Sequence, residues 1–377
     1  MVTTDKTFFL HHYEASPYAQ KIRAMFGLTG HRWGSVLSPP YPPRPNVDPL
    51  AGGYRRIPVA QLGADIFCDT SLIATEVAGF TGHAELAPRV SEPDALALVD
   101  RAEGAVFFAA ITSVPPLKLL GTLLLRNGPF STLKFVRDRA GMMKGASVKP
   151  PQGEDAARLF DEFLADLDSH LATRDVLDGD RPSYADFCAY HPLWLALSVG
   201  GGKTLRQYAN VCGWYERMEA LGQGEREEMS PEDAFNEAGR FDPRELPTDV
   251  AGDEALGREV TIAPVDYGKV GVTGRLVAAS ADRFVLLRPR SLTGRLIHKD
   301  TGAPVVDARL RLRHADSGIR GSEGGTVRIS TDADGRFTVE RIAPGSFEIE
   351  VLETPLRGEV TVPDERQDAR RIEVFAR

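Results

Sequence analysis

The chain has 377 residues, of which 42% are hydrophobic and 26% are charged. These values are ordinary for a folded protein of two or three domains. The formal net charge of −8 argues against a general nucleic-acid-binding role. Cys68, Cys188 and Cys212 are widely spaced and form no metal-binding pattern, so we expect buried thiols and neither a disulfide framework nor a metal site.

The first residues, 1–6, show no signal-peptide pattern. The longest apolar stretches, 105–111 and 117–125, are too short or too interrupted to cross a bilayer. We therefore expect a cytoplasmic protein with no membrane partner.

Three fragments follow one another between residues 10 and 74. The first, 11–23, predicts a strand that ends in a helix, with Ser16 as N-cap and Pro17 at the first helical position. The second, 52–59, predicts an extended segment that contains Pro58. The third, 63–73, predicts a strand, a turn and a helix that opens with Asp69 and Thr70. Each fragment alone is also an ordinary cap or turn.

In this order and at these spacings, the fragments resemble the thioredoxin-fold half of a glutathione transferase that places Ser-Pro after its first strand. The resemblance implies that the Ser16 hydroxyl donates a hydrogen bond to the glutathione thiolate, at a helix N-terminus that favours negative charge. It also implies that Ile57 and a cis-Pro58 pair with the cysteinyl backbone of glutathione. Asp69 and Thr70 would hold its γ-glutamyl carboxylate.

A proline-rich segment from 38 to 46 interrupts the common pattern of this family. So many prolines block a regular helix and favour an extended conformation. The segment either shapes the expected pocket through Arg44 or Tyr41, or it closes the pocket. Arg55 and Arg56 follow nearby, and we expect them to be solvated at the surface, with binding of a carboxylate as the alternative.

The region from 90 to 221 is predicted to be helical. Apolar residues recur at helical spacing between 154 and 170, and Ser183 with Asp186 predicts a capping box before another helix. Asp186 is thus expected to support folding and not to act as an acid catalyst. By the same resemblance, this is the all-α half of the transferase, and a hydrophobic substrate pocket lies between the halves. Its expected lining consists of Tyr13, Tyr18, Phe107, Phe108 and Ile111.

The composition changes after residue 221. Residues 222–258 are acidic and contain a helix start at Ser230-Pro231, followed by a linker. From 259 to 290 the hydrophobic period becomes 2, which predicts a small β-extension. Residues 291–377 alternate short strands with tight turns and resemble the transthyretin-like β-sandwich of carboxypeptidase regulatory-like domains.

The predicted fold is therefore multidomain: a thioredoxin-like α/β domain over 1–83, an all-α domain over 90–221, a linker, a β-extension, and a C-terminal all-β sandwich. The resemblance implies a glutathione transferase that activates the thiol of glutathione. The thiolate would attack a small or medium hydrophobic electrophile by conjugation, isomerisation or dehalogenation, in a homodimer. Two alternatives remain. One is a non-catalytic binding or scaffold protein, and the other is a biosynthetic enzyme that uses the cleft without glutathione.

Overall fold

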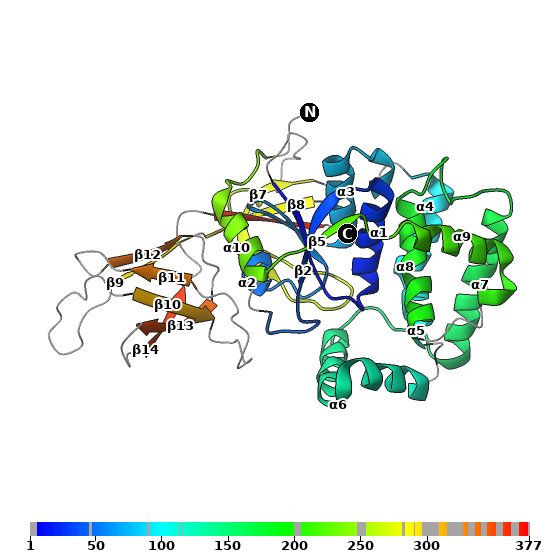
Figure 1. The fold of residues 1–377 in the computed structure, drawn as a ribbon, viewed down its shortest axis with the longest axis horizontal. Helices are drawn as coiled ribbons and strands as arrows, with labels where there is room; N and C mark the ends of the chain where they lie inside the picture. Colours follow the sequence, from blue (N-terminus) through cyan, green and yellow to red (C-terminus); the bar gives the residue numbers. More distant parts are fainter. Residues whose placement is uncertain are drawn as a thin grey trace.

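The computed structural model describes residues 6–44, 47–88, 91–112, 114, 116–199, 205–246, 254–280 and 283–289. Beyond these it describes the strands at 291–295, 309–314, 327–330, 336–340, 345–351, 357–362 and 369–375. A mixed sheet occupies the centre of the molecule, with a helical unit on one side and two smaller sheets on the other (Figure 1).

The N-terminal part is thioredoxin-like, as predicted. Strand β1 (Phe8–His12) pairs in parallel with β2 (Arg32–Leu37) and antiparallel with β3 (Val59–Leu62), which pairs antiparallel with β4 (Asp65–Cys68). Helices α1 (Pro17–Thr29) and α3 (Thr70–Thr81) lie on the side of the sheet that faces the helical unit (Figure 1). Every residue of β1 is buried, because this central strand is covered on both faces.

The helical unit packs against α1 and α3 through one continuous hydrophobic core. Its helices are α4 (Pro93–Glu103), α5 (Ala105–Thr112), α6 (Pro116–Met143), α7 (Gly153–Leu171), α8 (Tyr184–Ser198) and α9 (Ala209–Ala220). The predicted capping box is present at the start of α8, between Ser183 and Asp186. Asp186 also accepts hydrogen bonds from the Leu177 backbone N–H at 2.9 Å and from Trp214 Nε1 at 2.8 Å. Its role is therefore to tie a loop and two helices together.

The central sheet extends well beyond the thioredoxin-like strands. On one side β5 (Glu225–Glu228) adds in parallel to β2, a strand that the sequence pattern did not predict. On the other side β4 is followed by β15 (Ala369–Phe375), β8 (Arg283–Pro289), β7 (Val272–Ala279) and β6 (Glu259–Ile262). Helices α2 (Asp48–Ala51) and α10 (Pro231–Arg240) lie on the face of the sheet opposite α1 (Figure 1). Ser230 caps α10 as predicted, since its side chain accepts from the Asp233 backbone N–H.

The last strand of the chain lies apart from its neighbours in sequence. We expected residues 369–375 to belong to the C-terminal sandwich, but β15 pairs in parallel with β4 and antiparallel with β8. The remaining strands of this region form a four-stranded sheet and a two-stranded sheet. The first contains β10 (Arg309–His314), β11 (Val327–Ser330), β13 (Gly345–Val351) and β14 (Arg357–Val362), and the second contains β9 (Ser291–Arg295) and β12 (Arg336–Glu340). The transthyretin-like sandwich stays a prediction.

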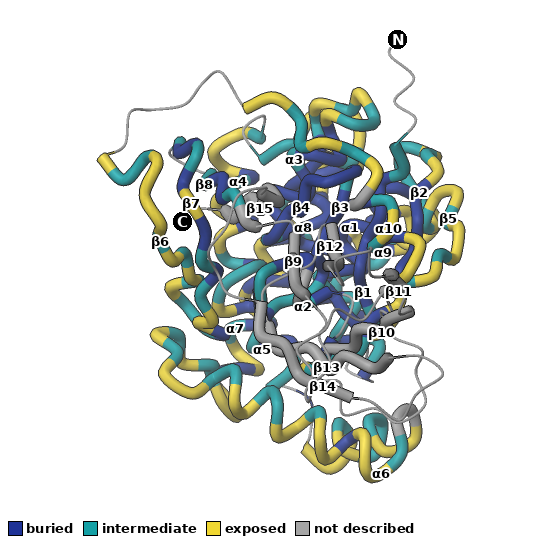
Figure 2. The backbone as a smooth tube through the Cα atoms, turned by 90° about the vertical axis from the view of Figure 1, so that its left-hand side faces the viewer, coloured by how far each residue is buried: buried dark blue, intermediate teal, exposed yellow. Residues whose placement is uncertain are grey.

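Burial is greatest around β1, β3, β4, α1 and α8, whereas α6 lies along the lower margin of the molecule and is largely exposed (Figure 2). Helix α6 bends at Gly128, whose backbone is not helical (φ 72°, ψ 167°), and Pro129 follows. Among the described residues, no single helix has the length and apolar composition to cross a membrane. The pair formed by Ala105–Thr112 and Pro116–Leu125 meets that test only together, across a bend of 84°.

Candidate functional site

Ser16 begins α1 directly after the loop that follows β1. Its backbone is extended (φ −78°, ψ 117°), and its Oγ accepts a hydrogen bond from the Ala19 backbone N–H at 3.2 Å. The side chain is buried, and no acidic residue lies in the first turn of the helix. Because a capping hydroxyl accepts through oxygen, its own proton remains available for donation. The helix dipole adds partial positive charge at this point.

The Ile57–Pro58 peptide bond is cis and lies immediately before β3. The chain that leads to it is braced by Arg44, a buried residue of the proline-rich segment. The Arg44 guanidinium donates to the Tyr54 carbonyl at 2.5 Å and the Arg55 carbonyl at 3.2 Å, and its Nε donates to Asp48 Oδ1 at 2.7 Å. Arg44 therefore holds the backbone before Ile57 in place, and its guanidinium is occupied by these hydrogen bonds.

Asp69 and Thr70 open α3 after β4. Asp69 has φ 85°, which a non-glycine residue rarely adopts, and its carboxylate accepts from the Ser71 backbone N–H at 2.9 Å. Thr70 is buried at the first helical position. The Ser71 hydroxyl lies 2.8 Å from the Tyr184 hydroxyl of α8, so the start of α3 is tied to the helical unit.

The strand register brings these three segments to one end of the sheet. His11 of β1 lies opposite Val59 of β3, and Val59 lies opposite Cys68 of β4. The chain leaves β1 toward Ser16, enters β3 from Pro58, and leaves β4 toward Asp69. Because paired strands keep neighbouring residues in rows, Pro58 and Asp69 lie next to this row, and the loop that leads to Ser16 leaves from the same end of the sheet.

The expected substrate residues separate into two groups. Tyr18 of α1 packs against Phe107 of α5, with ring centres 4.6 Å apart, and Phe107 packs against Phe108 at 5.6 Å. Ile111 is partly buried on the same helix, one turn further on. Tyr13 makes a different contact, because its hydroxyl accepts from Arg139 of α6 at 3.2 Å.

Tyr267, which lies between β6 and β7, reaches the aromatic group and was not among the predicted site residues. Its ring lies 5.7 Å from that of Phe108 and 4.2 Å from the guanidinium carbon of Arg56. Burial raises the pKa of the Tyr267 hydroxyl, which is hydrogen-bonded to Tyr18. Nothing in the local pattern marks this residue, since an isolated Asp-Tyr-Gly between two strands predicts only a turn.

The expectation that Arg55 and Arg56 are solvated was wrong. Arg55 is buried and forms an ion pair with Asp138 of α6. Arg56 forms an ion pair with Asp266 and donates to the Tyr267 carbonyl at 2.6 Å. Both arginines are paired because α6 and the segment around 266 fold over the chain before Pro58. We call residues 263–271, which join β6 to β7, the strap.

A buried ionic cluster lies behind the aromatic group. Lys21 of α1 forms an ion pair with Glu103 at the end of α4, and the Cys188 thiol donates to Glu103 Oε1 at 3.3 Å. Burial would lower the pKa of Lys21, but the carboxylate of Glu103 outweighs it and raises that pKa. Burial raises the pKa of Cys188. This thiol is therefore kept protonated and is a poor nucleophile. The expectation of buried thiols holds for Cys68 and Cys188, whereas Cys212 is only partly buried.

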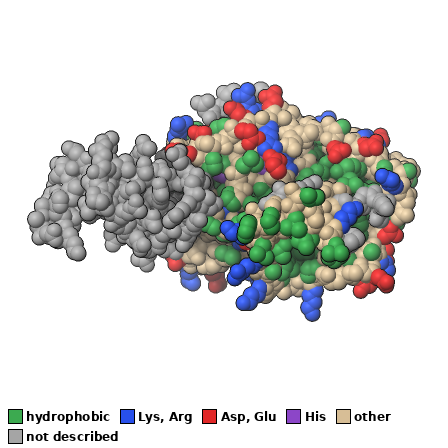
Figure 3. All heavy atoms as spheres, turned by 60° about the horizontal axis from the view of Figure 1, so that its bottom comes forward, with side chains coloured by type: hydrophobic (Ala, Val, Ile, Leu, Met, Phe, Trp, Pro, Cys, Tyr) green, Lys and Arg blue, Asp and Glu red, His purple; other side chains and the backbone are tan. Residues whose placement is uncertain are grey.

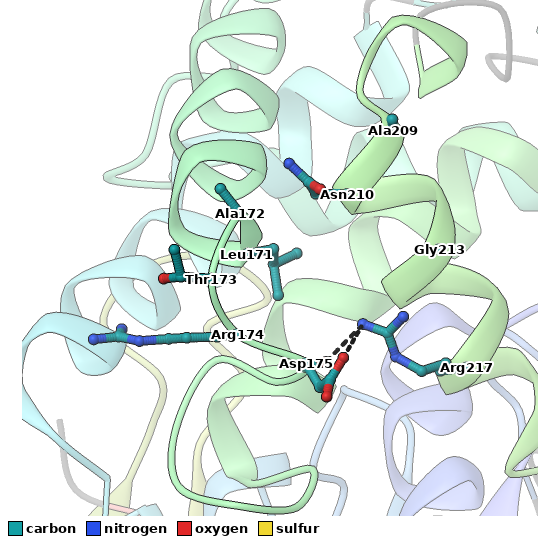
Figure 4. A pocket seen from close by; sticks show the side chains of 9 residues that line it. All are labelled: Leu171, Ala172, Thr173, Arg174, Asp175, Ala209, Asn210, Gly213 and Arg217. Carbon is teal, nitrogen blue, oxygen red and sulfur yellow. Dashed lines mark hydrogen bonds and ion pairs between the residues drawn. The ribbon is translucent and has the colours of Figure 1, made fainter.

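A separate surface depression of about 350 Å³ lies between the end of α7 and α9 (Figure 4). Arg217 crosses it to the Asp175 backbone carbonyl at 2.8 Å and to the Asp175 carboxylate at 3.7 Å. None of the residues expected in the site lines this depression.

Comparison with known proteins agrees with the fold of the thioredoxin-like part and of the helical unit. A glutathione S-transferase N-terminal domain model matches residues 10–78, and a glutathione S-transferase C-terminal domain model matches residues 150–217. No curated protein matches the sequence.

Several solved structures are similar to this one. A GST-like protein from Pseudomonas syringae is 25% identical, and the alignment covers 89% of this chain and 99% of that one with a TM-score of 0.58. A glutathione S-transferase from Xanthobacter autotrophicus is 19% identical over 58% of this chain and 95% of its own, with a TM-score of 0.37. A glutathione S-transferase from Methylobacterium radiotolerans, in complex with glutathione sulfonate, is 19% identical over 57% of this chain and 91% of its own, also with a TM-score of 0.37.

The two domain models fall on the thioredoxin-like part and on the helical unit, and they support the glutathione S-transferase superfamily for both. The Pseudomonas protein aligns over a far longer part of the chain than the two models match. The likeness therefore extends into the additional β-strands.

Proposed function

We propose that the protein is a glutathione transferase in which Ser16 stabilises the thiolate of bound glutathione. The observation that carries the proposal is that the Ile57–Pro58 segment, the Asp69–Thr70 segment and the loop that leads to Ser16 all meet the sheet at the same end. Glutathione is a substrate in this reaction and not a resident cofactor.

Each segment offers a complementary group. The backbone N–H and C=O of Ile57, directly before β3, can pair with the cysteinyl backbone of glutathione as an added strand would. The N-terminus of α3, with the Thr70 hydroxyl, offers donors to the γ-glutamyl carboxylate. The unusual φ of Asp69 supports a specialised role for this turn, because such backbone conformations cluster at functional sites.

The chemistry follows from the position of Ser16. The glutathione thiol loses its proton to solvent, and the resulting thiolate accepts a hydrogen bond from the Ser16 hydroxyl. The sulfur then attacks an electrophilic carbon of the second substrate, and the leaving group departs with its bonding electron pair. Tyr18, Phe107 and Phe108 form an aromatic wall that suits a hydrophobic electrophile. Conjugation, isomerisation and dehalogenation can all begin with this attack. The chain is also proposed to act as a homodimer in the cytoplasm.

Calorimetric titration with glutathione tests the proposal. We expect saturable binding, and Thr70→Val should weaken it about tenfold, because a hydrogen bond to a charged carboxylate is lost. The matched control is Thr75→Val on the same helix, whose hydroxyl bonds the Ser71 carbonyl instead. Absence of heat at millimolar glutathione would reject the proposal in favour of a scaffold or of an enzyme that does not use glutathione.

A further inference from the structure

Helix α6 carries a concentration of exposed hydrophobic side chains. Leu125 is 91% exposed, Leu117 85%, Phe130 82% and Leu133 69%. Most of the exposed large hydrophobic side chains of the described residues belong to this helix; the others on it are Leu120, Leu124 and Val136. Such a concentration is unusual for a surface that faces only water. Figure 3 shows hydrophobic side chains gathered on the lower side of the molecule, with Lys and Arg side chains along the margin.

The same stretch is strongly basic. Between residues 104 and 153 the single acidic residue is Asp138, whereas the whole chain has a formal net charge of −8. Asp138 is already paired with Arg55. Lys118, Lys134 and Arg137 are exposed on α6 itself. The basic residues of the stretch are Lys118, Arg126, Lys134, Arg137, Arg139, Lys144 and Lys149. The exposed apolar surface is thus combined with positive charge in an otherwise acidic protein.

The part of α6 that follows the bend at Gly128 is attached to the body of the protein along one side. Its exposed apolar side chains therefore lie on the side that faces away from the body. The Asp138–Arg55 ion pair and the hydrogen bonds from Arg139 to Tyr13 and to the Pro40 carbonyl hold one side of this arm. The Thr132 hydroxyl donates to the Leu123 carbonyl at 2.9 Å and links the two arms across the bend. The exposed hydrophobic side chains lie on the remaining surface of α6 and belong to none of the hydrophobic cores formed by the described residues.

We propose that α6 docks the protein onto an anionic lipid surface. Its Leu and Phe side chains enter the headgroup region, and its Lys side chains lie against lipid phosphates. A contact between α6 and the same face of a second copy is disfavoured, since a two-fold contact would bring identical basic residues together. Spanning the bilayer is not required. This inference revises the expectation of no membrane partner, and it is independent of glutathione binding.

Flotation of the full-length protein with vesicles tests the proposal. Vesicles of phosphatidylcholine containing phosphatidylglycerol should bind the protein, and vesicles of phosphatidylcholine alone should bind it much more weakly. High salt should weaken binding. Replacing Lys118 and Lys134 with Gln should lower the partition coefficient roughly fivefold per lysine. Leu125→Gln combined with Phe130→Gln should lower it by at least about tenfold.

The controls are exposed residues of the same kinds elsewhere. Leu246 is 47% exposed outside α6, and Arg206 is exposed in the short helix Leu205–Gln207. Leu246→Gln and Arg206→Gln should bind vesicles as the parent protein does. Thermal denaturation and light scattering verify that all variants keep their fold and oligomeric state. Equal binding to neutral and anionic vesicles, or binding that the α6 variants do not change, would overturn the proposal. Absence of binding to both kinds of vesicle would also overturn it. If the α6 variants then dissociate an oligomer, a second copy of the chain covers this face.

Discussion

The ring of Tyr267 lies over the guanidinium of Arg56, 4.2 Å from the guanidinium carbon to the ring centre, and Arg56 stands two residues before the cis-proline Pro58. Tyr267, a residue of the strap, thus lies against the segment that is proposed to bind glutathione. The same strap is fastened to the end of α6, since the Ser147 backbone N–H donates to the Asp266 carbonyl at 2.8 Å and the Gly268 N–H donates to the Met142 carbonyl at 2.9 Å. The strap therefore borders the candidate glutathione site.

This arrangement predicts that Tyr267 limits the size of the electrophile. Tyr267→Ala removes the ring that packs on Phe108 and leaves space beside the aromatic wall. We expect kcat/KM for a bulky aryl halide to rise on the order of tenfold relative to a small one, within the range that pocket volume usually controls. Steady-state rates with both substrates measure the ratio. Tyr267→Phe keeps the ring and should leave the ratio near that of the parent; an unchanged ratio in Tyr267→Ala would place the strap outside the substrate path.

Ser16 is predicted to have two separable roles. Ser16→Ala removes the hydroxyl that accepts from the Ala19 N–H, and the loss of the cap should lower the free energy of unfolding by about 0.5–2 kcal/mol. It should also raise the pKa of the bound glutathione thiol and reduce turnover of an aryl halide. Ser16→Gly separates the roles, because glycine is nearly as good a cap but offers no hydroxyl. Thiolate absorbance across a pH titration reports the thiol pKa. If Ser16→Gly keeps the parental turnover, Ser16 is a cap and nothing more.

The sequence carries most of the information on the site, for a physical reason. The caps at Ser16 and Asp69 depend on adjacent residues, so local patterns predict them. The cis form of Pro58 was expected from the family resemblance, which depends on the order and spacing of the three fragments. The Ser183–Asp186 capping box was found in the same way. The partners of Arg55, Arg56 and Tyr267 were not found, because those contacts join residues more than 80 positions apart in sequence. Strand β15 was placed with its neighbours in sequence, because an alternating pattern gives the period of a strand but not the sheet that it joins.

Stability should fall in mild acid because of buried histidines. His191 packs against Tyr18 and Phe107, with ring centres 4.8 Å and 5.7 Å apart, and His12 lies on β1. Burial lowers the pKa of each to about 3, from the ordinary value of 6.5. The unfolded chain therefore binds more protons than the folded protein below pH 6.5. The free energy of unfolding is therefore unaffected by these two rings above that pH, and it decreases as the pH falls toward about 3.

Denaturant unfolding at two pH values measures this effect. Each of the two histidines should lower the free energy of unfolding by about 1.4 kcal/mol at about pH 5.5, one unit below its pKa in the unfolded chain. His191→Phe keeps an aromatic ring in the same packing and removes one titrating group. The variant should therefore lose about 1.4 kcal/mol less than the parent between about pH 8 and about pH 5.5. An identical loss in both proteins would show that His191 is protonated in the folded state or relieved of burial.

Strand β15 is predicted to stabilise the thioredoxin-like part directly, because it pairs with β4. Ile372 lies opposite Ile66 of β4 and Leu286 of β8, so a proline at this position removes a ladder hydrogen bond in the interior of the central sheet. We expect Ile372→Pro to lower the melting temperature of the transition that reports on the tryptophans of the core, Trp33 and Trp214, which are fully buried. The expected loss is about 1–3 kcal/mol, because a carbonyl group of a neighbouring strand is left without its hydrogen bond. The matched control is Thr361→Pro in β14, an edge strand of the four-stranded sheet that pairs with β13 alone among the described strands. This control should leave the tryptophan transition in place. If both variants lower it equally, the smaller sheets and the central sheet unfold as one unit; if neither does, β15 contributes nothing to the stability of the transferase part.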